Sequence, residues 1–196
     1  SFVYTSRIAE PGRYGTVEGL DASAEAPRHI TGIRWHANGL GYSGDRPAHV
    51  FTVPVPDLNA EPLYTAAPAV REEGESAPEV SLVPAASTRL TTGDASHAGV
   101  VFSADGTEVF AALDEIEDRH RDLRTRVIAI AVDGGATREV LGVEAGLSAN
   151  AIAVADDGTV AILAADSGPS GIDFIAPGVA LYLLGDGAPQ RVTAPE

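Results

Sequence analysis

Short apolar runs separated by turn-forming residues dominate the chain and determine its predicted secondary structure. The runs are rich in Val, Ile, Phe and Tyr, and Gly, Asp, Asn or Pro bounds them, a pattern typical of strands joined by tight turns. Helical periodicity is scarce. The clearest runs predict strands at residues 2–8, 30–35, 50–55, 100–102, 108–113, 126–132, 151–154, 160–164 and 179–184. The predicted fold class is therefore all-β.

Asp-Gly turns recur along the second half of the chain at a nearly constant spacing. Asp105-Gly106 and Asp157-Gly158 lie 52 residues apart, and Asp133-Gly134 and Asp186-Gly187 lie 53 residues apart. A weaker copy of the first turn is Asn38-Gly39. Both dipeptides are preferred in two-residue hairpins, because both central residues can adopt a positive φ. The shared spacing indicates an internal repeat of about 50 residues.

Each repeat predicts four antiparallel strands, which is the unit of a β-propeller blade. We expect one domain, residues 1–196, made of about three such blades, and therefore an incomplete propeller. The expected blades span residues 28–90, 91–145 and 146–194, with a partial blade at 1–27. Because a blade must bury both faces against its neighbours, self-association through open blade faces is expected.

Two features predict that the chain is a piece of a longer protein, with a processed chain as the alternative. It opens on Ser1, inside a predicted strand, and it contains no Met. Closed propellers have four to eight blades, more than this chain supplies. Residues 59–87, rich in Pro, Ala and Glu, lengthen the first unit, and only a strand at 80–83 is predicted within them.

The net charge of −15 argues against nucleic acid and anionic membranes as partners, because both repel an acidic surface. The absence of Cys excludes disulfides and thiolate metal sites. No apolar run approaches the length of a membrane span, and the first residues lack the pattern of a signal peptide. A cytoplasmic location is the expectation.

The hairpin beginning at Phe102, with the sequence FSADG, resembles the recurrent blade motif of prolyl oligopeptidase-family propellers, with Ala104 where Pro is usual. Residues 10–55 are similar to the propeller of bacterial acylaminoacyl-peptidase-like members, and residues 117–135 resemble the loop, strand and turn that follow the motif there. The resemblance implies a separate α/β-hydrolase domain with a Ser-Asp-His triad. It also implies that the propeller caps that active site and restricts peptide substrates by size.

No residue of this chain is predicted to be catalytic. A hydrolase elbow needs Gly-x-Ser-x-Gly between a strand and a helix, and the nearest approach, at Ser43, ends in Asp45 and precedes a strand. The five His residues lack zinc-protease spacing, and the acidic run 114–122 lacks the Gly of a calcium loop. Neither a metal nor a cofactor is predicted.

Two loops carry the candidate substrate or domain-interface residues. In the loop 114–126, the candidates Arg119, Arg121 and Arg124 would pair with a hydrolase-domain carboxylate or hold a peptide carboxylate; alternatively, neighbouring acids neutralise them. In the equivalent loop from Gly168, the candidates are Ile172 and Phe174, together with Ile175. These would contact the hydrolase domain or line a substrate path; alternatively, they pack on their own blade.

The sequence therefore predicts a non-catalytic propeller fragment that gates peptide access to an α/β-hydrolase domain. The alternative is a stand-alone TolB-like propeller that binds proteins as a scaffold. A sugar or lactone hydrolase would need converging metal ligands, and no such set is visible in the sequence.

Overall fold

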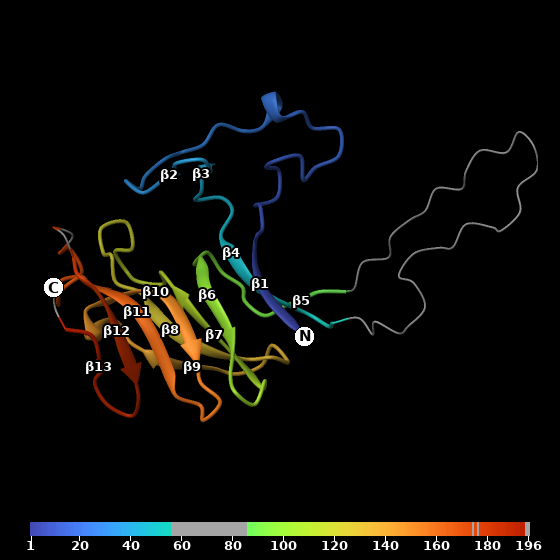
Figure 1. Ribbon diagram of the computed structural model, residues 1–196. Helices are drawn as coiled ribbons and strands as arrows, with labels where there is room; N and C mark the ends of the chain where they lie inside the picture. Colours follow the sequence, from blue (N-terminus) through green and yellow to red (C-terminus); the bar gives the residue numbers. More distant parts are fainter. Residues whose placement is uncertain (56–85, 174, 176, 195–196) are drawn as a thin grey trace, which may run out of the picture.

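The computed structural model describes residues 1–55, 86–173, 175 and 177–194, and within them it is almost entirely β-structure (Figure 1). Two single-turn 3-10 helices, Ala22–Ala24 and Val143–Ala145, interrupt the strands. The strands are β1 Phe2–Arg7, β2 His36–Ala37, β3 Gly41–Tyr42, β4 Ala48–Val53, β5 Thr88–Arg89, β6 His97–Phe102, β7 Glu108–Leu113, β8 Arg126–Ala131, β9 Thr137–Leu141, β10 Leu147–Val154, β11 Val160–Asp166, β12 Val179–Leu184 and β13 Gln190–Arg191. The predicted all-β class is confirmed.

These strands form four antiparallel sheets. Two are four-stranded, in the orders β6-β7-β8-β9 and β10-β11-β12-β13, so that neighbours in sequence are neighbours in space. A three-stranded sheet has the order β1-β4-β5, and β2 pairs with β3 in a small hairpin. We call the three larger sheets the first (β1, β4, β5), middle (β6–β9) and last (β10–β13) sheets. They form an open stack, without a closed barrel or propeller in the described part of the chain.

The core lies on both faces of the middle sheet. On one face, Val109, Ala111 and Ile130 are fully buried against Val50 of the first sheet. The other face meets the last sheet, where the buried side chains include Ala112, Val127, Ile162, Ala164 and Tyr182. Strand β10 packs chiefly on β6, and β6 packs on β1 and β4. Burial of apolar side chains between successive sheets therefore holds the stack together.

The predicted turns lie where expected, but their backbone differs from the prediction. Gly106 and Gly158 have positive φ of 70° and 85°, whereas Asp105 and Asp157 do not. Each glycine N–H donates to the carbonyl three residues earlier at 2.9 Å. The Asp105 carboxylate accepts the N–H of Thr107 at 3.0 Å, and Asp157 accepts that of Thr159 at 2.9 Å. A two-residue type I′ turn needs a positive φ at both central residues, so these turns are of another kind, and the loops span residues 103–107 and 155–159.

Two further predictions need correction. The apolar stretch 30–35 is not a strand, because it belongs to the long excursion 8–47 that connects β1 with β4. Strand β1 pairs with β4 along its whole length, from Phe2 opposite Val53 to Arg7 opposite Ala48. The predicted partial blade 1–27 and the predicted blade 28–90 therefore contribute strands to one sheet, and no boundary between sheets lies at residue 27. The predicted strand at 80–83 lies outside the described residues.

Long connections gather at one end of the stack, here called the connection end. The excursion 8–47 joins β1 to β4, residues 114–125 join β7 to β8, and residues 167–178 join β11 to β12. The Ser96 N–H donates to Asp114 at 2.9 Å, and the Leu123 N–H donates to the Gly171 carbonyl at 2.7 Å. The opposite end carries the short Asp-Gly turns, and Figure 1 shows the excursion on the side away from them.

Candidate functional site

The connection end contains a hollow of about 990 Å³ between the connections 114–125 and 167–178. Three of the six candidate residues, Arg121, Arg124 and Ile172, line it together. The remaining lining side chains are Glu115, Ile116, Glu117, Asp118, Asp122, Arg126, Glu139, Val143, Glu144 and Ser170. Two loops that the sequence analysis treated separately therefore contribute to one hollow.

The Arg124 guanidinium forms hydrogen bonds to residues of three connections that meet at the hollow: its own, the one after β9 and the one after β11. Its Nη2 lies 2.6 Å from Oδ2 of Asp122, and its Nε donates to Oδ1 of the same carboxylate at 3.0 Å. Its Nη1 donates to the carbonyl oxygens of Pro169 at 2.8 Å and Val143 at 3.2 Å. The hydrogen bond from Arg124 lowers the pKa of the Asp122 carboxyl, which in turn raises the pKa of Arg124. The Arg124 guanidinium is therefore already paired with acceptors of its own chain.

Arg126, which also lines the hollow, is likewise paired with acidic side chains. Its Nε donates to Glu139 at 2.8 Å, and its Nη1 lies 3.1 Å from Glu115. The Arg121 backbone N–H donates to the Asp118 carbonyl at 2.9 Å, but its guanidinium forms no hydrogen bond or ion pair with any residue that the structure describes. The lining holds six acidic and three basic side chains, so its net charge is negative. A cationic group is therefore the better electrostatic match for the hollow.

Arg119, the third arginine candidate of this loop, does not line the hollow. Its Nη2 lies 2.7 Å from Oδ2 of Asp94, and this hydrogen bond lowers the pKa of Asp94. Arg34 of the excursion donates to the backbone carbonyls of Arg119 and, at 2.7 Å, Asp122. Arg124 is thus neutralised by Asp122 of its own loop, whereas Arg119 is neutralised by Asp94, which lies outside that loop. The contact with Arg34 spans more than 80 residues and carries no sequence signal.

Of the apolar candidates, Ile172 and Ile175 are described by the structure, and both are exposed. Ile172 lines the hollow and is 55% exposed, and Ile175 is 91% exposed. Neither packs into the core of its own sheet. Phe174 lies outside the described residues. An exposed apolar pair beside the hollow provides surface for a peptide or for another domain.

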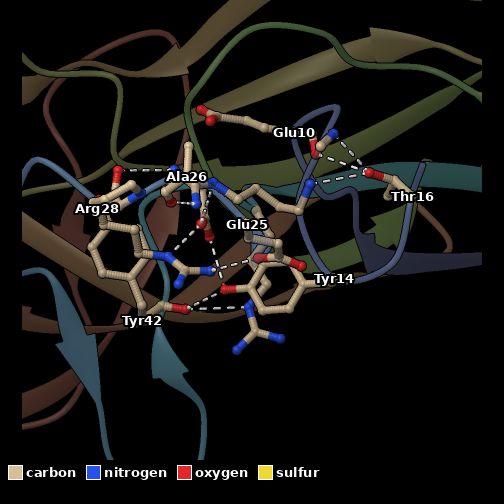
Figure 2. Close-up of polar contacts among 12 residues, drawn as sticks. Glu10, Tyr14, Thr16, Glu25, Ala26, Arg28 and Tyr42 are labelled. Carbon is tan, nitrogen blue, oxygen red and sulfur yellow. Dashed lines mark hydrogen bonds and ion pairs between the residues drawn. The ribbon is translucent and has the colours of Figure 1, made fainter. Parts of the chain in front are cut away.

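A second polar cluster, missed in the sequence analysis, shapes the excursion (Figure 2). At its centre is Asp45, which is 4% exposed and accepts hydrogen bonds from the Tyr14 hydroxyl at 2.9 Å and from Arg28 Nε at 2.8 Å. The guanidinium of Arg46 lies 4.5 Å from the centre of the Tyr14 ring, a cation–π distance. Burial, followed by the bond to Asp45, raises the pKa of Tyr14. The cluster holds residues 8–47 as a formed unit above the sheets.

Ser43, the nearest approach to a hydrolase elbow in the sequence, lies just after the short strand β3. The Ser43 N–H donates to the Trp35 carbonyl at 3.1 Å in the loop after β3. Across residues 1–55 and the described part of 86–194, no group of three or more His, Asp or Glu side chains is placed to hold a metal ion. In the same residues, no helix is long and apolar enough to cross a membrane. His49 and His97 are instead buried where the first and middle sheets meet.

Comparison with known proteins gives no family assignment. No protein-family model matches the chain, and no curated protein matches it.

Proposed function

We propose that this chain is the non-catalytic, incomplete β-propeller of a prolyl oligopeptidase-family serine peptidase, and that its connection end restricts peptide access to a separate α/β-hydrolase domain. The proposal combines the sequence resemblance with the stacking of the middle and last sheets. Each is a four-stranded antiparallel meander, and the first strand of one packs on the first strand of the other. Such packing of two four-stranded meanders supports the proposal that they are adjacent blades.

The first sheet supports an incomplete propeller because of the way it is built. Strand β1 contacts β6, as β7 of the middle sheet contacts β10. The long excursion follows β1 just as the other long connections follow β7 and β11. By this correspondence, β1, β4 and β5 are the second, third and fourth strands of a blade. The described residues supply no first strand for it.

The observation that carries the gating role is the continuous layer of long connections over one end of the stack. Arg34 bonds the excursion to the connection 114–125, and Arg124 bonds that connection to 167–178. The turns 103–107 and 155–159, which the structure describes at the opposite end, are short, and this favours the connection end as the surface for a partner domain. The acidic hollow beneath this layer would admit a cationic peptide segment in preference to an acidic one.

An activity assay on the isolated chain tests whether it is non-catalytic. It should not hydrolyse a chromogenic aminoacyl or peptidyl ester, whereas turnover that a serine-directed inhibitor blocks would refute a non-catalytic role. The coding sequence downstream of Glu196 separates the proposal from a TolB-like scaffold. A Gly-x-Ser-x-Gly followed by Asp and then His supports the peptidase, and a stop codon supports the scaffold.

A further inference from the structure

The excursion 8–47 takes no part in the core of the stack. None of its described residues belongs to the buried apolar clusters between the sheets. Among them only Asp45 is buried, and it serves the polar cluster inside the excursion (Figure 2). Segments with few buried apolar contacts open at a low cost in free energy, and enzyme lids are drawn from such segments. Apolar burial therefore does not fix the excursion to the sheets.

The excursion has a narrow base and a formed interior. At the base, the Ile8 N–H donates to the Pro47 carbonyl at 3.1 Å. The Glu10 N–H donates to the Asp45 carbonyl at 2.9 Å, so that the pairing of β1 with β4 continues beyond the sheet. Above the base, the hydrogen bonds of the Asp45 side chain hold the interior together. A formed segment of this kind can rotate as a body, because the few residues at its base absorb the change in φ and ψ.

Beyond the base, Arg34 makes every hydrogen bond that joins the excursion to the rest of the described chain. Its Nη2 donates to the backbone carbonyls of Arg119 and, at 2.7 Å, Asp122. These carbonyls belong to a turn in which the N–H groups of Arg121 and Asp122 both donate to the Asp118 carbonyl at 2.9 Å. Arginine side chains commonly satisfy the carbonyl groups that such a turn leaves without a partner. The excursion is therefore attached at its base and at one remote point.

Hydrogen bonds rather than apolar packing hold this remote contact. The residues on either side of Arg34 are Ile33, which is 70% exposed, and Trp35, which is 41% exposed. Gly32 lies so close to the His120 imidazole that a Cβ atom at residue 32 would overlap the ring. Because the residues that flank Arg34 are already exposed, the contact can break without uncovering a buried apolar surface.

We propose that the excursion 8–47 is a lid that rotates about its base, and that Arg34 holds the lid closed against residues 119–122. Opening breaks the hydrogen bonds of the Arg34 guanidinium and leaves the folded sheets unchanged. It also releases the backbone of Asp122, which lines the hollow together with Arg121, so the position of the lid and the shape of the hollow are coupled. The motion is a property of this chain alone, whereas its effect on peptide entry rests on the proposed function.

Distances between two spin labels test the proposal on the chain 1–196. The chain contains no Cys, so labels at Glu18→Cys on the excursion and Asp156→Cys in the turn 155–159 are unambiguous. With Arg34 intact, one narrow distance distribution is expected. Arg34→Ala should raise the population of a second distance about tenfold, because it removes hydrogen bonds from a charged donor. Gly32→Val, which overlaps His120, is a second way to break the contact and should act in the same direction.

Arg121→Ala is the matched control. It removes a guanidinium from the same loop that has no hydrogen bond to a described residue, and it should leave the distances unchanged. A single narrow distance in both Arg34→Ala and Gly32→Val overturns the proposal, as does a broad distribution while Arg34 is intact. No substrate or hydrolase domain enters the measurement. A rigid excursion therefore leaves the proposed peptidase role standing, and a chain without a hydrolase domain still opens its lid.

Discussion

Arg34 donates from Nη2 to the backbone carbonyl of Asp122 at 2.7 Å, and so joins the excursion after β1 to the connection after β7. The Asp122 carboxylate in turn holds Arg124, which bonds the carbonyl of Pro169 in the connection after β11. One chain of contacts therefore crosses the connection end of all three larger sheets. These contacts fix the three connections of the proposed gating surface relative to one another, and their loss is the basis of the first prediction.

Replacing Asp122 with Ala should destabilise the fold. The Asp122 side chain is 8% exposed and that of Arg124 is 17% exposed, so the substitution leaves a largely buried guanidinium without its anion. We expect the free energy of unfolding to fall by about 2 kcal/mol, the range for a partly buried charged hydrogen bond. Urea denaturation measures this change. Arg121→Ala, in the same connection but without an ion pair to a described residue, should change stability by less than about 0.5 kcal/mol.

Asp105 should titrate far below an ordinary carboxyl group. Hydrogen bonds from the Ser103 hydroxyl, and then from Thr107, lower the pKa of Asp105 to about 2. The ionised form is thus favoured by the fold, so its stabilising effect is complete above the unfolded pKa of about 4 and is lost as the pH falls toward about 2. NMR titration measures the midpoint directly. Asp105→Asn should flatten the acid limb of the stability profile, whereas Asp156→Asn, at an exposed turn position, should leave it unchanged.

The junction between the first and middle sheets should weaken at mildly acidic pH. His49 and His97 lie there with ring centroids 6.0 Å apart, and burial lowers the pKa of both imidazoles. Because the unfolded chain binds protons first, stability is complete above about pH 6.5 and falls as the pH drops through that value. The urea midpoint should therefore decrease between about pH 7 and about pH 5. An unchanged midpoint contradicts this explanation, and the exposed His120→Gln variant should behave like the wild type.

The hollow should prefer basic peptides to acidic ones, and its affinity should fall as salt is added. Glu117→Arg should weaken the binding of a labelled arginine-containing peptide several-fold, because it reverses a charge in the acidic lining. Asp186→Arg makes the same charge change at the opposite end of the stack and serves as the control. Fluorescence anisotropy measures both. Equal weakening by the two variants would reveal a non-specific charge effect instead of a site.

Much of the fold was predictable from the sequence because its signals are local. The runs around Val109, Ile130 and Ile162 are short, nearly continuous apolar segments that border Asp-Gly turns, and each forms a strand. The stretch 30–35 is apolar only at Ile30, Ile33 and Trp35, and it lies in an excursion held by Asp45, where contacts distant in sequence override local propensity.

The candidate site was predictable only in part, for the same reason. The two loops that line the hollow stand out by composition, so Arg121, Arg124 and Ile172 could be found. The side chain that neutralises Arg119 could not, since Asp94 lies 25 residues away on another connection. Asp45 was likewise missed as the buried centre of the excursion, because an isolated Asp after a Ser-Gly pair resembles any surface turn.

The central claim is that this chain serves a serine peptidase without carrying its nucleophile. Labelling the full-length natural protein with a fluorophosphonate, followed by mass mapping of the modified peptide, tests that claim most directly. The account predicts one labelled serine, located outside residues 1–196 and within a Gly-x-Ser-x-Gly segment. A labelled serine inside residues 1–196, or a folded full-length protein that takes up no label, would contradict it.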